Sequence, residues 1–135
     1  MTMAFARSSY RQAETYGAQD VEDPHQIILV TLRELVRSLG VLKAAQEVSN
    51  KYPEEHMNRS FTAIYILQSS LDFEQGGEVA TSLFQVYEFC RLQVVKAFRR
   101  EDDVKLADAL DAVNGIYSAW SEIGSQVGAK EATNK

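Results

Sequence analysis

Apolar residues recur along this chain at alternating spacings of three and four, the period of an α-helix that buries one face. The first such stretch begins at Asp23, whose carboxylate can cap a helix; Pro24 fits the first helical position, and Gln26 stands in capping-box register. The pattern predicts a helix from about Pro24 to Val48. Its apolar stripe is Ile28, Leu32, Leu35, Leu39 and Leu42.

Three further stripes follow the same period. A second helix is predicted after Pro53, where two acidic residues suit the positive end of a helix dipole. The fourth helix, the last in the chain, is predicted to be capped by Asp102 and Asp103 and to end near Val127. The second stripe is Phe61, Ile64, Leu67 and Leu71; the third is Val79, Leu83, Val86, Cys90, Val94 and Ala97; the fourth is Leu106, Leu110, Val113, Tyr117 and Trp120.

Four long helices with short connections favour neighbours that run antiparallel, so the chain is predicted to be all-α, an up-down four-helix bundle. Residues 1–22 show no sustained period and are expected to form a flexible N-terminal arm. The bundle is expected to span residues 23–128. Residues 129–135 have nothing to bury and are expected to be a disordered tail.

Two adjacent glycines, Gly76 and Gly77, separate the second and third stripes. A glycine pair can cradle a phosphate, but a phosphate loop needs Gly-Lys-Ser/Thr after a strand, and a dinucleotide fingerprint needs three spaced glycines. Neither pattern is present. We therefore expect the second helix to end at a left-handed Gly76 and Glu78 to lie in the first turn of the third helix.

Composition and charge exclude several classes of protein. The chain has 135 residues, 45% of them hydrophobic, and a formal net charge of −5 with no basic stripe, so we expect neither nucleic acid nor acidic lipid as a partner. No apolar run approaches the ~20 residues that span a bilayer, and the N-terminus has no secretory pattern. With one cysteine as well, these features predict a cytoplasmic protein without membrane insertion.

Helical bundles can hold di-metal sites, which require Glu-x-x-His pairs within helices. The two histidines, His25 and His56, do not stand in such pairs. His25 fits a capping or surface role, and Cys90 lies on a core stripe, where a small buried apolar residue is expected rather than a nucleophile. The sequence therefore predicts no enzyme, no metal and no cofactor.

Two helices carry more apolar residues than one stripe needs. The surplus in the third helix is Phe84, Tyr87, Val95 and Phe98, and in the second it is Tyr65, Ile66 and Phe73. Such residues either widen the core or form an apolar groove for a partner. Periodicity alone favours neither interpretation.

Four motifs, in order from about Ser9 to Ile123, resemble those of the flagellar export chaperones of the FliS type. They are SYRQ with Tyr10, DPHQII at 23–28, SLDFEQGGEVATSLFQVYEF at 70–89 and SAWSEI at 118–123. In the third motif the glycine pair forms the family's signature turn. The chain departs from the family at Arg33 and Leu35, where a tyrosine and a glycine are common, and at Arg7, where an apolar residue often stands.

The resemblance implies a chaperone that binds the disordered C-terminal segment of flagellin in apolar grooves, blocks premature polymerisation and delivers the client to the flagellar type III export apparatus. Export-gate components are possible further partners, and the free protein is expected to be a monomer or weak homodimer. The implied groove residues are Phe84, Tyr87, Val95 and Phe98, with Tyr65 and Ile66 secondary. Tyr10 is expected to lie on an arm that covers the groove in the free protein, or merely to anchor that arm to the core.

Other functions fit the same pattern. A bundle adaptor or regulator that binds another flagellar export protein would use the same groove. An enzyme or metal carrier would use the bundle interior, and a self-associating structural protein would use the surplus apolar residues. Trp120 is expected to be structural, because a large aromatic residue on a core stripe usually anchors packing.

Overall fold

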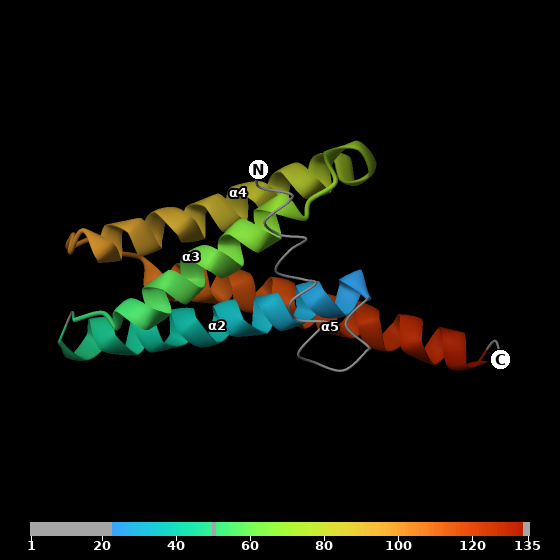
Figure 1. Ribbon diagram of the computed structural model, residues 1–135, viewed down its shortest axis with the longest axis horizontal. Helices are drawn as coiled ribbons and strands as arrows, with labels where there is room; N and C mark the ends of the chain where they lie inside the picture. The colour runs from blue at the N-terminus through green and yellow to red at the C-terminus, as the bar shows by residue number, and fades with distance from the viewer. Residues whose placement is uncertain (1–22, 50, 134–135) are drawn as a thin grey trace.

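The computed structural model describes the backbone of residues 23–49 and 51–133, and the side chains of those up to Ile123. Its elements are the helices α2 (Pro24–Val48), α3 (Glu54–Ser69), α4 (Phe73–Phe98) and α5 (Leu106–Thr133), with no strand in the described part. Successive helices run in opposite directions along one axis (Figure 1). Helix α2 packs against α3 and α5, and α4 packs against the same two from the other side. The predicted all-α bundle is confirmed.

Helix α2 begins as the sequence predicts. The Asp23 side chain accepts a hydrogen bond from the backbone N–H of His25 at 3.0 Å, and Pro24 occupies the first turn. Helix α3 begins after Pro53 without a side-chain cap, and its first turn carries Glu54 and Glu55. These two carboxylates lie at the positive end of the helix dipole, where they are stabilising.

Helix α4 begins earlier than predicted, at Phe73 rather than near Glu78. Asp72 caps it, and its Oδ1 accepts from the backbone N–H groups of Glu74 and Gln75, each at 3.1 Å. One helical turn follows before the glycine pair. The capping position of Asp72, with Gln75 three residues later, is a signal in the sequence that our prediction overlooked.

The glycine pair is a kink inside α4. Gly77 has φ 51° and ψ −124°, and it is the glycine with positive φ, so the prediction of a left-handed Gly76 was wrong. Gly76 instead closes the first turn, where its N–H donates to the Asp72 carbonyl at 2.8 Å. A Cβ on Gly76 would lie 2.9 Å from the Ala80 Cβ. The pair therefore does interrupt the helix, but within α4 and not between two helices.

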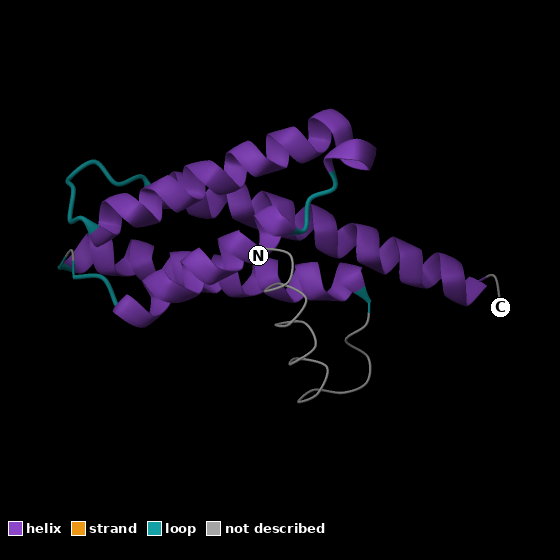
Figure 2. Ribbon diagram, turned by 45° about the horizontal axis from the view of Figure 1, so that its top comes forward, coloured by secondary structure: helices purple, strands orange, loops and turns teal. Residues whose placement is uncertain are grey.

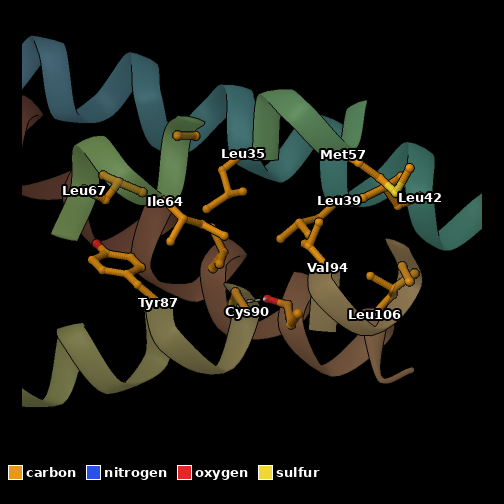
Figure 3. Close-up of a cluster of buried hydrophobic side chains, with 14 of the residues drawn as sticks. Leu35, Leu39, Leu42, Met57, Ile64, Leu67, Tyr87, Cys90, Val94 and Leu106 are labelled. Carbon is orange, nitrogen blue, oxygen red and sulfur yellow. Dashed lines mark hydrogen bonds between the residues drawn. The ribbon is translucent and has the colours of Figure 1, made fainter. Parts of the chain in front are cut away.

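The core runs along the bundle axis (Figure 3). The four predicted leucines of α2 from Leu32 to Leu42 are fully buried, as are Ile64, Leu106 and Val113. In Figure 3, Tyr87 and Leu67 lie at one end of this row, and Met57 lies at the other. The stripes predicted the buried face of α2 correctly, while Met57, Ala63, Ala80, Tyr87, Val104 and Ala109 are core residues that they omitted.

The α4–α5 connection is fixed by two glutamines and not by the predicted aspartate caps. Gln93 Oε1 accepts from the backbone N–H of Lys105, and Gln46 Nε2 donates to the Val104 carbonyl, both at 2.8 Å. Asp103 instead pairs with Lys96 at 3.2 Å, and α5 begins only at Leu106. The prediction of Asp102 and Asp103 as caps was wrong because the connection continues to Lys105, whose N–H is held by Gln93, before α5 starts at Leu106.

Helix α5 continues to Thr133, past the end predicted near Val127. Its last turns project beyond the other three helices (Figures 1 and 2). None of the helices in the described ranges combines the length and apolar character needed to cross a membrane.

Candidate binding groove

A hollow lies at the end of the bundle where α2 begins and α3 ends. Toward this end α4 and α5 diverge (Figures 1 and 2), and a cavity of about 500 Å³ opens between the helices. Its buried lining includes Leu67, Ala80 and Tyr87, which are at most 3% exposed. Its exposed lining includes Val79, at 67%, and Ile123, at 48%. The cavity is therefore lined by apolar side chains from all four helices.

A shallower hollow of about 360 Å³ continues this cavity along α4 and α5. It shares Val79, Leu83 and Ile116 with the first cavity and adds Val86. We call the two together the apolar groove. It is defined by Ile28, Val79, Leu83, Val86, Ile116, Trp120 and Ile123, with Leu67, Ala80 and Tyr87 beneath them.

The groove exists because part of a core stripe lacks a partner helix. Val79, Leu83 and Val86 belong to the stripe predicted to be buried in α4, and the same stripe is buried farther along, at Cys90 and Val94. Where α4 and α5 diverge, the stripe is only partly covered: Val79 is exposed, Leu83 and Val86 are half-buried, and the buried positions are Ala80 and Tyr87 instead. An apolar stripe without a neighbouring helix is a surface that another helix can cover.

Trp120 forms one end of the groove and is held in place from α2. Its Nε1–H donates to the His25 carbonyl at 3.0 Å, and its ring stacks on the His25 imidazole with centroids 4.7 Å apart. His25 was expected to be a cap or a surface residue; it is half-buried. The hydrogen bond and the stack together fix the orientation of the indole. Trp120 is therefore both a packing residue and part of the groove.

The residues predicted to bind a client do not form one surface. Tyr87 lies beneath the groove, buried to 3%, so it offers little of the exposed area that the prediction required. Phe84 is 38% exposed, and its ring contacts Phe73 at a centroid distance of 6.0 Å. Tyr65, Ile66 and Val95 are half-buried. Tyr10 lies outside the described residues.

Phe98 lies at the opposite end of the bundle. It is 63% exposed and lines a separate cavity of about 440 Å³ that also includes Tyr52, Met57 and Arg100. The sequence placed Phe98 and Phe84 on one helix, but the length of α4 separates Phe98 from the groove. The groove residues of α4, Val79, Leu83 and Val86, were predicted to be core residues. Periodicity does not show where a neighbouring helix diverges from the stripe.

The interior offers little chemistry in the part of the chain that the structure describes. Burial raises the pKa of the Cys90 thiol to about 12, and the thiol donates to the Ala109 carbonyl at 3.7 Å. A thiol with this pKa stays protonated at neutral pH and is a poor nucleophile. Among the described residues, no group of three or more His, Cys, Asp or Glu is placed to hold a metal ion.

Comparison with known proteins agrees with the family resemblance of the sequence motifs. Residues 5–127 match the family model described as flagellar protein FliS. The chain is 28% identical to the flagellar secretion chaperone FliS of Vibrio cholerae, over 85% of each chain. It is 26% identical to that of Salmonella typhimurium, over 98% of this chain and 99% of the other, and 26% identical to FliSB of Pseudomonas aeruginosa, over 87% and 94%. No solved structure matches significantly. The match of the family model to nearly the whole chain shows that this protein belongs to the FliS family.

Proposed function

We propose that this protein is a cytoplasmic flagellar export chaperone, and that the apolar groove binds the disordered C-terminal segment of flagellin. The observation that supports this function is the partly covered core stripe of α4, in which Val79 is exposed and Leu83 and Val86 are half-buried. Val79, Leu83 and Val86 lie beside Ile116 of α5, at the end of the bundle where these two helices diverge. A client segment that becomes helical in the groove supplies the missing neighbour for this stripe.

Folding of the client on binding suits the biological task. A disordered segment loses conformational entropy when it becomes helical, and this ordering costs about 2–5 kcal/mol of the gross interaction energy. The burial of apolar groove residues offsets that cost. An occupied segment cannot join a filament, and the client stays unfolded for delivery to the type III export apparatus. Binding of this kind needs neither ATP nor a cofactor.

Calorimetric titration of the protein with the C-terminal segment of its own flagellin tests this proposal. We expect one-to-one binding with a large negative heat-capacity change, because apolar surface is buried. Val79→Ser removes about 1 kcal/mol of apolar burial and should weaken the affinity roughly fivefold. Val79 is suited to this test because it is already 67% exposed, so its loss leaves the core intact.

The matched control is Val48→Ser. Val48 is 86% exposed at the end of α2, far along the bundle from the groove, and the substitution is chemically identical. We expect this variant to bind as the parent protein does. Absence of heat at micromolar concentrations, or equal weakening by both substitutions, would show that the groove is not the flagellin site.

A further inference from the structure

Charge is distributed unequally along the bundle. We define the groove end as residues 23–32, 61–87 and 112–123, which surround the apolar groove. These residues include five carboxylates, Asp23, Asp72, Glu74, Glu78 and Glu122, and no Lys or Arg. The other residues whose side chains the structure describes, up to Ile123, carry ten Lys or Arg and ten Asp or Glu. The groove end therefore has a net charge of −5, and the rest of the described molecule is neutral.

The carboxylates of the groove end are not neutralised within the described structure. The described residues form four ion pairs, and all four lie outside the groove end. Asp72 lines the deeper hollow of the groove, and Glu78 lines its shallower continuation. Among the residues that the structure describes, no Lys or Arg lines either hollow. An occupant of the groove consequently meets the carboxylates of this part of the chain at the edge of the groove, without a described Lys or Arg beside them.

We infer that the groove selects an amphipathic helical segment whose apolar face is flanked by Lys or Arg. This inference rests on the proposed function and adds the chemical class of the segment. A charge of one sign around a low-dielectric groove attracts oppositely charged ligands and speeds their association. The same charge disfavours an acidic segment, because like charges would be brought together as the helix docks. Specificity thus comes from the edge of the groove, and binding energy comes from its apolar lining.

Charge also argues against a second copy of this chain as the occupant. Two groove ends facing each other would bring together two surfaces of net charge −5 without an intervening cation in the described residues. Repulsion of this kind opposes association through this face. A cationic client segment therefore fits the groove better than a homodimer does.

Synthetic helical peptides with one apolar face and three different flanks test the inference. The flanking positions are all Lys, all Gln or all Glu, and binding is followed by the fluorescence of Trp120, the single tryptophan, which lines the groove. At 50 mM NaCl we expect the Lys peptide to bind roughly tenfold more tightly than the Glu peptide. At 1 M NaCl, where the screening length is about 3 Å, the difference should fall below about twofold.

Two triple variants, each of which removes three negative charges, show which part of the molecule causes the difference in affinity between the Lys and Glu peptides. Glu74→Gln with Glu78→Gln and Glu122→Gln reduces the net charge of the groove end from −5 to −2 and should abolish most of the difference between the Lys and Glu peptides. Glu54→Gln with Asp102→Asn and Asp111→Asn makes the same change in the other part of the molecule and should preserve the difference. All six residues are exposed, so both variants should remain folded.

The Gln peptide separates this inference from the proposed function. If the Gln peptide binds while the Lys and Glu peptides bind equally at low salt, the charge inference is wrong and groove binding stands. If the two triple variants lose the difference equally, net charge and not the groove end is responsible, and the inference is also wrong. If no peptide changes the Trp120 fluorescence or the heat of mixing, the groove is not a helix-binding site and both proposals fail.

Discussion

At the scale of single residues, Gly77 has the most specific structural requirement in the molecule. Its φ of 51° and ψ of −124° lie in a region that is essentially restricted to glycine. The residue turns the chain between the first turn of α4 and the long remainder of the helix. Gln75 and Gly76, which line the groove, are positioned by this turn. The Gly76–Gly77 pair thus shapes one end of the groove.

Substitution of Gly77 by alanine should destabilise the protein by about 1–3 kcal/mol, because a Cβ is strained in this conformation even though the space around it is open. The measurement is the free energy of unfolding in urea. The control is Gly115→Ala, since Gly115 lies within helix α5, where an added Cβ meets nothing within 4 Å. This control should be neutral or stabilising by up to about 1 kcal/mol. Equal effects of the two substitutions would contradict the role of Gly77.

Two buried acids predict a loss of stability at alkaline pH. Burial raises the pKa of the Cys90 thiol from 9.0 to about 12. Burial also raises the pKa of the Tyr87 hydroxyl from 10.0 to about 12, and the neighbouring Cys90 adds a smaller effect in the same direction. In the unfolded chain both groups ionise near their ordinary pKa values, whereas in the folded protein they remain neutral. Their contribution is therefore fully present below pH 9 and is lost as the pH rises from 9 to about 12.

Urea unfolding of the parent protein and of Cys90→Ala at pH 8 and pH 10.5 measures this effect. The parent should lose stability between these two pH values, and the thiol accounts for roughly 2 kcal/mol of the loss. The variant is less stable at pH 8 because of the cavity, but its loss between the two pH values should be smaller. An identical loss in both proteins would show that the Cys90 thiol does not titrate differently on unfolding.

At the scale of elements, the connection between α4 and α5 depends on two part-buried hydrogen bonds from glutamine side chains and not on the predicted aspartate caps. Gln93 is 5% exposed, and its side chain holds the Lys105 N–H next to the start of α5. Gln93→Ala leaves that N–H without its acceptor and should cost about 1–3 kcal/mol. Thermal or urea unfolding measures the loss. Gln85→Ala, at an exposed position of the same helix, should change the stability by less than about 0.5 kcal/mol and serves as the control.

The four helices could be predicted because each stripe has a 3.6-residue period and clear boundaries such as Asp23–Pro24 and Pro53. The apolar groove could not be predicted from these stripes. Val79 and Val94 stand on the same predicted stripe, yet Val79 is 67% exposed and Val94 is fully buried. The difference arises from the divergence of α4 and α5, which depends on how helices distant in sequence pack. A period identifies an apolar face and does not identify the neighbour that covers it.

The resemblance to the FliS family could be recognised from short motifs, but it did not locate the groove. Phe98 and Phe84 were selected as surplus apolar residues, and the structure places Phe98 beside a different hollow. Among the residues predicted to bind a client, Tyr87 lines the groove, at its buried base. Groove residues that belong to the core stripe were not considered, because an uncovered core stripe and a covered one have the same sequence pattern.

At the scale of the whole molecule, one end of the described bundle carries the apolar groove and five carboxylates, and the rest of the described bundle is neutral in net charge. The opposite end, where Phe98 lines a separate hollow, is tied by the Gln93 and Gln46 hydrogen bonds. The groove end combines the exposed Val79 and Ile123 with an edge that carries carboxylates and, in the described ranges 23–32, 61–87 and 112–123, no Lys or Arg. In the proposed function, this difference between the ends lets a client bind at one end while the remaining core maintains the fold.

Methyl NMR spectra with and without the C-terminal segment of flagellin test this account most directly, because they report on each end of the bundle separately. We expect the largest shift changes at methyl groups of the groove, those of Val79, Leu83, Ile116 and Ile123. The chemical shifts of the methyl groups of Val48 and Val104, at the opposite end of the bundle, should remain unchanged. Shift changes centred on Val95 and Val104, with the groove methyl groups unaffected, would contradict the assignment of the groove as the client site.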